Sequence, residues 1–285
     1  MLTNMYYIKE FDPWNSPYCT CPPKYSLNPY TGCDHCCIYC YITSYIPNAF
    51  QVRTKKDFFK KLQKDVKKID KNKVVSLSNS SDPYPTVEKK LGITRKTLEI
   101  LSHNQVKYQI VTKSNLVLRD LDILKQSKTC VAITITTLKE KIAKKLEPNA
   151  PSPVERLKTL KKLHDNNIPV VVRIDPIIPF LNDKETETLL EKISFVDHIV
   201  ASTFKPRYDS WERLRKVFPE TAKTLKKYYF KKEIKISNSW YLPTETRFKI
   251  LEKIKRNAEN MGISFGSCRE NFYSKQSCDG THLIK

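Results

Sequence analysis

The sequence predicts an α/β fold in the form of a partial (β/α)6 barrel of the TIM type, with a small, mostly helical C-terminal extension. Three observations support this prediction. Short apolar runs rich in β-branched residues alternate with amphipathic stretches, their spacing is that of strand–helix units, and six such units are present. Six units are too few for a closed eight-fold barrel but suit an open one.

Each of the six predicted strands is a short apolar segment. The first, at residues 25–27, precedes a cysteine-rich loop. The other five span residues 74–77, 108–112, 130–135, 170–174 and 198–202. Since the segments between them can hold a crossover helix, we expect the strands to be parallel.

Amphipathic stretches separate the predicted strands. Apolar residues recur every three or four positions over residues 58–69, 98–101 and 157–163, which is typical of helices with one buried face. Ser114 stands where an N-cap belongs, and a further capped helix begins near Thr244. These helices fill the connections that a parallel sheet requires.

The pattern loosens after residue 204 into a basic, aromatic and helical region. We therefore expect a barrel over residues 1–204, which includes the cysteine-rich loop, and an extension over residues 205–285 packed on the barrel.

The composition, with 40% hydrophobic and 28% charged residues in 285 positions, is that of a globular protein. The sequence contains no run of ~18 apolar residues that could span a membrane, and "MLTNMYYIKEF" is no secretory signal. We expect a cytoplasmic monomer with reduced cysteines. In that compartment a tight cysteine cluster indicates metal binding or catalysis rather than disulfides.

Lys and Arg exceed Asp and Glu by 21. The excess is concentrated in residues 51–73, with ten basic and three acidic side chains, and in residues 205–235, with eleven and four. Such a field attracts polyanions, above all nucleic-acid phosphates. Solvated, lysine-rich helix faces are the alternative interpretation.

Four cysteines, Cys33, Cys36, Cys37 and Cys40, lie within "GCDHCCIYCY". Structural zinc usually takes two cysteine pairs that are well separated in sequence, whereas the pairs here would be adjacent. Cys33, Cys37 and Cys40 give C-x3-C-x2-C, compact enough for one loop to wrap an iron–sulfur cubane. Three thiolates leave one iron open to a substrate or cofactor, and Cys36 is then a bystander.

The stretch "NPYTGCDHCCIYCY" resembles the signature of radical S-adenosylmethionine (SAM) enzymes. Blocks similar to spore photoproduct lyase and its photolyase-like relatives follow over most of the first 200 residues: "SNSSDPYPTVEKKLGITRKTLEIL", "IVTKSNLVLRDLDIL", "VAITITTLKEKIAKKLEPNAPSPVERL" and "IPVVVRIDPIIPFLND". The resemblance implies a [4Fe–4S] cluster on Cys33, Cys37 and Cys40 whose open iron chelates SAM. It also implies reductive cleavage of SAM to a 5′-deoxyadenosyl radical that abstracts a hydrogen atom from a substrate.

The resemblance further implies a set of SAM-binding residues. Tyr39 would pack beside the cluster and the adenine. Ser81 and Asp82 would hold the methionine ammonium, and Lys113 with Ser114 would meet the methionine carboxylate. The alternatives are loop packing for Tyr39, an Asp-Pro turn at Asp82, a solvated Lys113 and a helix cap at Ser114.

Two further strands would contribute to the same site. Thr134 or Thr136 would approach the SAM ribose, since alternation allows only one inward-facing set of positions. Arg173 lies in an apolar strand and needs a partner. That partner is the SAM carboxylate, a substrate phosphate, or a structural salt bridge with Glu147 or Asp175.

The sequence also departs from spore photoproduct lyase. That enzyme has a hydrogen-donating cysteine just upstream of the Ser-Asp pair, where this chain reads "SLSNSSD" without one. Repair in that form therefore does not follow. Cys130 on the fourth predicted strand is the nearest substitute catalytic residue, although a buried structural cysteine explains it better.

The remaining cysteines leave two interpretations open. Cys19, Cys21, Cys268 and Cys278 hold an auxiliary cluster or zinc, or they are free buried thiols, and their spacing fits no standard pattern. The tail "CDGTHLI" is similar to the C-terminus of photolyase-like relatives and would close over the barrel mouth.

Three functions remain as hypotheses. The first is a radical SAM enzyme that acts on DNA or RNA, with ferredoxin or flavodoxin as electron donor. Aromatic residues of the extension would stack bases among lysines, and a base in a duplex would be flipped out. These aromatics are Tyr208, Trp211, Tyr228, Tyr229, Trp240 and Tyr241. The alternative, above all for Trp211 and Tyr229, is that the rings form the core of the C-terminal helices. The second is a radical SAM maturase of a peptide or protein, and the third is a non-catalytic, metal-stapled nucleic-acid binder.

Overall fold

The structure is a computed structural model that describes residues 5–11, 16–77, 80–230 and 234–285. An eight-stranded sheet forms its centre, in the order β1-β2-β3-β4-β5-β6-β7-β10. The strands are β1 (Lys9–Glu10), β2 (Tyr25–Leu27), β3 (Val75–Leu77), β4 (Tyr108–Thr112), β5 (Thr129–Thr134), β6 (Val170–Ile177), β7 (His198–Thr203) and β10 (Ser264–Ser267). All neighbours pair in parallel except β1 and β2. The predicted α/β fold with a partial barrel is confirmed.

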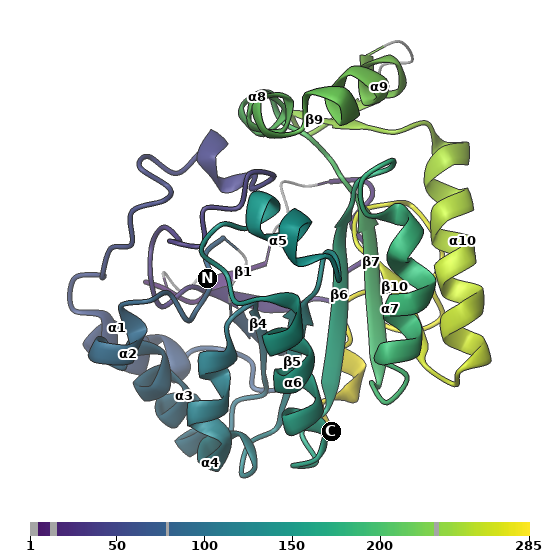
Figure 1. Cartoon of the computed structure of the whole chain (residues 1–285). Coiled ribbons are helices and arrows are strands. Elements are labelled where there is room, and N and C mark those ends of the chain that lie inside the picture. Colours follow the sequence, from purple (N-terminus) through teal and green to yellow (C-terminus); the bar gives the residue numbers. More distant parts are fainter. Residues whose placement is uncertain (1–4, 12–15, 78–79, 231–233) are drawn as a thin grey trace.

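Helices cover the outer face of the curved sheet (Figure 1). The α-helices are α1 (Phe58–Val66), α2 (Glu88–Leu91), α3 (Ile93–His103), α4 (Leu121–Leu124), α5 (Glu140–Leu146), α6 (Pro153–His164), α7 (Thr186–Lys192), α8 (Tyr208–Val217), α9 (Pro219–Phe230) and α10 (Thr244–Asn260). Four 3-10 turns are η1 (Ile42–Ser44), η2 (Asn115–Asp120), η3 (Asp183–Glu185) and η4 (Thr281–Leu283). The main core lies between this layer and the sheet and contains the fully buried Leu62, Leu98, Leu101, Leu160 and Leu163.

All six predicted strands are present, two of them, β2 and β4, with the predicted bounds. Two further strands of the sheet were not predicted. β10 adds a parallel strand beside β7, and β1 adds an antiparallel one beside β2. β10 reads "SFGS", which has no apolar run, so its strand conformation comes from pairing with β7 rather than from local preference.

The region after β7 forms a second, smaller core. Helices α8 and α9 lie beyond the upper ends of the strands in Figure 1, next to the two-stranded sheet of β8 (Ile234–Ile236) and β9 (Ser239–Tyr241). Five of the six aromatics proposed to stack bases are buried or half-buried, and Tyr208 alone of them is exposed, at 73%. These rings are used to build an apolar core, so they are not available at the surface to stack on bases.

The C-terminal tail fills the interior of the barrel at the end where the strands begin. Ile284 packs against inward-facing Cys130, Ala132, Val171 and Val200 of β5, β6 and β7. The chain therefore ends near the lower end of β6 in Figure 1, on the side opposite α8 and α9. The expectation that the tail closes over the mouth is wrong, because these small inward-facing side chains leave room for it inside.

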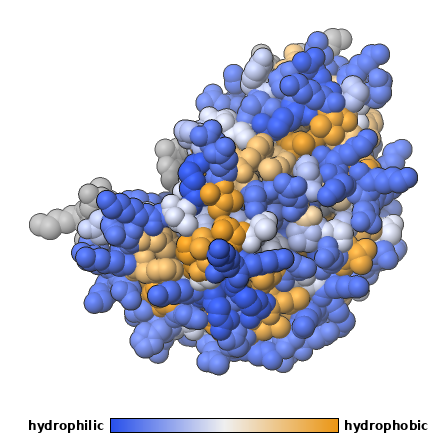
Figure 2. Space-filling view, turned by 60° about the vertical axis from the view of Figure 1, so that its left-hand side comes forward, coloured by the Kyte–Doolittle hydropathy of each residue, from blue (hydrophilic) through white to orange (hydrophobic). Residues whose placement is uncertain are grey.

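The surface is mostly hydrophilic on the face seen in Figure 2, with hydrophobic residues gathered toward its middle. Within the described ranges, no helix has the length and hydropathy to cross a membrane.

Candidate metal centre and cofactor cavity

A cavity of about 480 Å³ lies at the carboxyl-terminal ends of the parallel strands. This volume falls in the range of small-molecule sites, roughly 300–1,000 Å³. Each strand from β2 to β7 contributes inward-facing polar residues to its lining, among them Ser26, Ser76, Gln109, Thr134, Arg173 and Ser202. This end of a parallel sheet is where α/β folds bind ligands.

Three cysteines of the loop after β2 line this cavity. They are Cys33, Cys37 and Cys40. Cys36 has a left-handed φ of +54° and is not among the described lining residues. Burial raises the pKa of the Cys37 thiol to about 12, and it also raises the pKa values of Cys33 and Cys40. Neutral thiols of this kind lose their protons when a metal binds.

Gly32 sets the direction of the chain as it enters the loop. Its φ is +80°, and a Cβ at this position would lie 2.1 Å from the carbonyl oxygen of Gln51. The next residue, Cys33, donates its backbone N–H to the carbonyl of Ala49 over 2.8 Å. Glycine is therefore required here both for the left-handed backbone and for the close approach to residues 49–51.

Groups far away in the sequence hold the loop in place. The backbone N–H of Ile38 donates to the carbonyl of Leu146 over 2.9 Å. Arg213 of α8 donates from Nε to the Ile38 carbonyl over 2.8 Å and from Nη2 to the Cys40 carbonyl over 2.6 Å. Two charge-assisted bonds from one planar guanidinium fix the loop at two carbonyls that are two residues apart.

Asp82 connects the ends of β3 and β4. Its Oδ1 accepts from Tyr84 N over 3.0 Å and from Thr112 Oγ1 over 2.6 Å, and its Oδ2 accepts from Lys113 N over 2.9 Å. His35 Nδ1 of the cysteine loop lies 3.4 Å from Oδ2. The carboxylate is thus largely satisfied by this chain, although it lines the cavity.

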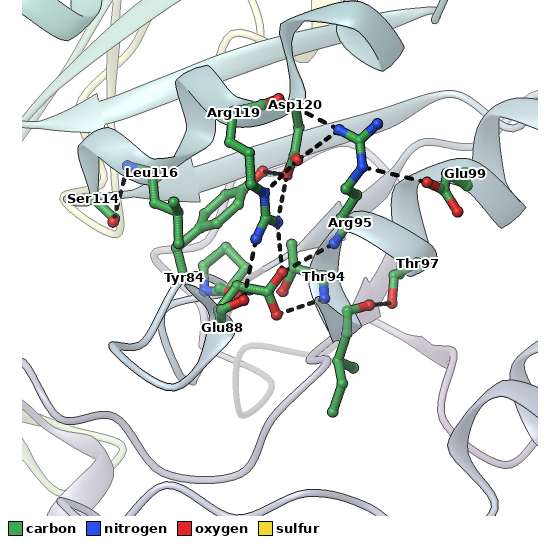
Figure 3. Close-up of polar contacts among 12 residues, drawn as sticks. Tyr84, Glu88, Thr94, Arg95, Thr97, Glu99, Ser114, Leu116, Arg119 and Asp120 are labelled. Carbon is green, nitrogen blue, oxygen red and sulfur yellow. Dashed lines mark hydrogen bonds and ion pairs between the residues drawn. The ribbon is translucent and has the colours of Figure 1, made fainter. Parts of the chain in front are cut away.

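A buried ion network anchors the segment that carries Asp82 (Figure 3). Arg119 pairs with Glu88 over 2.6 Å and with Asp120 over 2.8 Å. Tyr84 donates from its hydroxyl to Asp120 Oδ2 over 3.1 Å. Both carboxylates are fully buried, so the network compensates their desolvation and holds Tyr84, two residues after Asp82, in place.

Tyr39 is held by a second buried pair. Its hydroxyl donates to Glu147, which also pairs with Arg156 over 2.5 Å. Arg156 Nη1 donates to the carbonyl of Thr134 over 3.0 Å. Lys113 Nζ lies 5.6 Å from the centre of the Tyr39 ring. Burial opposes the charge of Lys113, but Cys37 and Glu147 raise its pKa, so Lys113 brings a positive charge to the cavity.

Arg173 of β6 has the structural partner that the sequence left open. Its Nη2 lies 2.6 Å from Asp175 Oδ2, and Ser202 Oγ donates to Asp175 Oδ1 over 3.0 Å. Cys268 lines the same cavity as Arg173. The guanidinium still lines the cavity, and its five donors leave capacity for a ligand.

The other candidate residues lie as follows. Thr134 lines the cavity, whereas Thr136 is buried outside it. Ser81 lines the cavity and donates to the carbonyl of Tyr30 over 3.0 Å. Ser114 caps η2 by accepting from Leu116 N over 3.2 Å and does not line the cavity. The cysteine of spore photoproduct lyase would fall near residues 78–79, which lie outside the described residues.

Cys130, the candidate hydrogen donor, is fully buried in the barrel interior. It contacts Gln109 Nε2 at 3.5 Å and the carbonyl of Gly280 at 3.8 Å, and it does not line the cavity. Burial raises the pKa of its thiol to about 12. These surroundings are those of a structural cysteine.

Sequence reasoning missed Arg213, His35 and most of the inward-facing polar set. Arg213 lies in the basic segment of residues 205–235, whose charge predicts binding to nucleic-acid phosphates. The tertiary structure shows instead that Arg213 donates to carbonyls of the cysteine loop. The polar set did carry a signal. Single polar residues at alternate positions of otherwise apolar strands, such as Ser76 and Gln109, predict a polar barrel interior.

A second group of cysteines lines the same cavity. Cys278 Sγ lies 3.2 Å from Cys21 Sγ, and Cys268 also contributes to the lining. Hydrogen bonds from Cys19 and Cys278 lower the pKa of the Cys21 thiol to about 3. The four cysteines that the sequence left without a role are thus brought to one region.

Comparison with protein families gives one assignment. The family model of the radical SAM superfamily matches residues 27–193. An uncharacterized protein of Methanocaldococcus jannaschii is 34% identical over 167 residues, 57% of this chain and 63% of that protein. An uncharacterized protein of Acidianus two-tailed virus is 34% identical over 172 residues, 54% of this chain and 56% of that protein. The chain thus spans less than two thirds of the length of these relatives.

Solved structures with the same fold include spore photoproduct lyase complexed with dinucleoside spore photoproduct. The TM-score is 0.70 at 15% identity, over 96% of this chain and 81% of that one. Streptococcus suis SuiB bound to the precursor peptide SuiA matches with a TM-score of 0.58 at 14% identity, over 85% of this chain and 48% of that one. At these identities the likeness concerns the fold.

Proposed function

Because this chain belongs to the radical SAM superfamily, whose enzymes use a [4Fe–4S] cluster and SAM, we propose that Cys33, Cys37 and Cys40 hold the cluster and that the cavity holds SAM. The observation that carries this proposal is the common cavity. Three thiols of one loop and polar side chains from successive strands line the same 480 Å³. The donor set fits, since thiolates are the ligands of iron–sulfur clusters and three of them leave one iron open.

Different residues around the cavity would bind different parts of SAM. A cluster held by Cys33, Cys37 and Cys40 would supply the electron for cleavage of SAM, which would yield a radical able to take a hydrogen atom from the substrate. Lys113 and Arg173 provide positive charge for the methionine carboxylate, with Lys113 beside the cysteine loop. Thr134 offers a hydroxyl to the ribose. Tyr39, fixed through Glu147, covers the cluster side and keeps water away from it.

Asp82 and Ser114 act mainly as positioning residues in this proposal. The carboxylate of Asp82 accepts from the backbone of Lys113 and from Thr112, so it holds the residue that carries the charge. It orients the methionine ammonium through its remaining lone pair together with Ser81. Ser114 caps η2 and thereby fixes the backbone that follows Lys113.

The proposed substrate is nucleic acid, which is modified or repaired in the cavity. Three observations support this. The net charge is +21. Exposed lysines lie along α1, just after its end, and along α9. They are Lys60, Lys64, Lys67, Lys68, Lys223, Lys226 and Lys227. Spore photoproduct lyase, bound to a dinucleoside in its solved structure, shares the fold over nearly the whole of this chain. Lysines track phosphates, while a base enters the cavity.

In this proposal the chain acts as a monomer, in which the extension of residues 205–285 also contributes β10 to the sheet of the barrel. Ferredoxin or flavodoxin delivers the electron. A peptide substrate, as for SuiB bound to its precursor peptide, is the competing assignment.

The test uses the full chain, reconstituted anaerobically with iron and sulfide and supplied with dithionite and SAM. We expect 5′-deoxyadenosine to form, and its rate to rise when single-stranded DNA or RNA is added. Binding to a fluorescent oligonucleotide should weaken steeply between 50 and 200 mM salt, by roughly 10-fold or more for a few phosphate contacts. Failure to bind oligonucleotide at low salt would exclude the nucleic-acid assignment and leave the peptide assignment.

A further inference from the structure

Four cysteines outside the cluster loop gather where the N-terminal segment meets the C-terminal tail. Cys21 and Cys278 are 257 positions apart in sequence, yet their sulfurs lie 3.2 Å apart. Cys19 lies two positions before Cys21 on the same segment. The two sulfurs and a carboxylate oxygen of Asp279 all lie within 4.8 Å of one another. None of these cysteines is in a disulfide, and Cys21 and Cys278 are free thiols at metal-binding distance from each other.

Cys268 belongs to the same group. A Cβ on Gly266 would lie 2.8 Å from the carbonyl oxygen of Cys278, so the tail rests directly on the end of β10. Cys268 follows two residues later and lines the cavity together with Cys21, Cys278 and Arg173. The close approach that requires a glycine at 266 is therefore what brings the fourth thiol to the tail.

We propose that Cys19, Cys21, Cys268 and Cys278 bind one zinc ion, which clips the C-terminal tail to the segment before β2. Four thiolates in a closed tetrahedron are a common structural zinc site. With Zn–S bonds of about 2.3 Å, neighbouring sulfurs in such a site lie about 3.8 Å apart, close to the 3.2 Å between Cys21 and Cys278. A [4Fe–4S] cluster places each cysteine on a different iron and spreads the sulfurs further.

Four thiolates around one zinc ion carry a net negative charge, and the surrounding residues can offset it. Lys24 is 4% exposed and pairs with Asp279. The other oxygen of Asp279 accepts from Thr281 N over 3.1 Å and from Thr281 Oγ1 over 2.7 Å. Asp279 is thus committed to Lys24 and Thr281 and stands beside the ligands instead of binding the ion. Lys24 and Arg173 place two positive charges near the four thiolates. Groups just outside the ligands of a metal site commonly offset the charge of the ligands in this way.

The site has a structural consequence for the barrel. The tail that follows Cys278 fills the barrel interior with Ile284 and contacts Gln109 through the carbonyl of Asp279, over 2.7 Å. A metal that joins Cys278 to Cys19 and Cys21 holds this tail in place from both ends of the sequence.

The experiment counts zinc and iron separately in the full chain, purified anaerobically with both metals in the medium. Wild-type protein should hold about one zinc in addition to the iron of the cluster. In the double variant Cys21→Ser/Cys278→Ser the zinc content should fall at least tenfold, while the iron content persists. Cys36→Ser is the matched control, since this half-buried cysteine lies outside both groups, and it should keep both metals.

A second measurement covers the case in which the double variant does not fold. Cobalt added to zinc-stripped wild-type protein should give the intense visible absorption of tetrahedral cobalt–thiolate, and the single variant Cys19→Ser should weaken it. Zinc retained by the folded double variant, a second set of iron in wild-type protein, or a Cys21–Cys278 disulfide in a peptide map would each overturn the proposal. Wild-type protein that contains zinc but no iron would instead count against the proposed cluster on Cys33, Cys37 and Cys40.

Discussion

The two ends of the barrel are built by the same strands but differ in what their inward-facing residues do. On β5, Cys130 and Thr134 share the inner face, and on β6 the same holds for Val171 and Arg173. Cys130 and Val171, near the starts of the strands, are apolar and contact the C-terminal tail. Thr134 and Arg173, nearer the ends, are polar and line the cavity. The chain fills one end of its barrel and leaves a polar cavity at the other.

This difference separates stability from chemistry along each strand. Substitutions at the amino end should alter the free energy of unfolding and leave the cysteine loop intact. Substitutions at the carboxyl end should alter metal and cofactor binding even where the fold survives. Glycines, arginines and histidines at the two ends allow this separation to be tested.

The largest effect is expected for Gly32→Ala at the carboxyl end. The new Cβ would lie 2.1 Å from the Gln51 carbonyl oxygen, in a backbone with φ +80°, so the cysteine loop must move. Iron per chain after reconstitution should fall from about four to near zero. Gly92→Ala is the matched control, because Gly92 has φ +61° but nothing within 4 Å. Normal iron loading of Gly32→Ala would contradict the assigned role of this turn.

Arg213→Ala should be next in size. It removes both hydrogen bonds to the Ile38 and Cys40 carbonyls and should lower the free energy of unfolding by about 1–3 kcal/mol. It should also speed the loss of iron to a chelator, followed by absorbance. Arg215→Ala on the same helix removes only an exposed pair with Glu212 and should change neither quantity. Equal effects of the two variants would mean that the loop does not depend on α8.

Gly280→Ala tests the amino end. Its Cβ would lie 2.6 Å from Val171 Cγ2 with φ +83°, which should cost about 1–3 kcal/mol of stability. Thermal unfolding should show the loss, while iron loading at the other end stays normal. Gly262→Ala, with φ +74° in open space, separates backbone strain from the clash with Val171. A loss of iron in Gly280→Ala alone would show that the two ends are coupled.

The smallest effect concerns His198, which lies under the tail. Burial and the neighbouring His282 lower the pKa of His198 to about 3. Between pH 6.5 and 3 the unfolded chain binds a proton that the folded chain does not, so stability falls as the pH drops below about 6.5. Acidification to pH 5 should cost up to about 2 kcal/mol, at 1.36 kcal/mol per unit.

Urea unfolding of His198→Gln at pH 7.5 and pH 5 measures this dependence. The variant should lose part of the decline seen in wild-type protein, whereas His103→Gln at the exposed His103 should retain it all. An undiminished decline in His198→Gln would assign the acid sensitivity to other groups.

The sequence predicted those features that depend on local pattern. Apolar runs identified six strands, and the cysteine spacing identified the loop whose thiols line the cavity. β10 was missed because "SFGS" becomes a strand only through its pairing with β7. The Arg213 contacts span more than 170 residues of sequence, and Cys21 and Cys278 are 257 apart. No local pattern signals such contacts, since they arise from the way the C-terminal region folds back on the barrel.

For the aromatics of the extension, the sequence leaves two interpretations open. Tyr229 and Trp211 lie among lysines, where they could stack bases or form a core, and the structure buries them in the second core. Composition does not distinguish a stacking surface from a small core, because both need aromatic rings and both are flanked by charge. Of the named aromatics, Tyr208 alone keeps the exposure that stacking requires.

The central claim is that three of the four clustered cysteines hold the catalytic cluster. The most direct test compares Cys36→Ala with Cys37→Ala, two adjacent positions of one loop, after anaerobic reconstitution. Cys36→Ala should retain about four iron per chain and form 5′-deoxyadenosine from SAM and dithionite. Cys37→Ala should lose most of its iron and form no 5′-deoxyadenosine. Equal iron contents in the two variants would contradict the assignment.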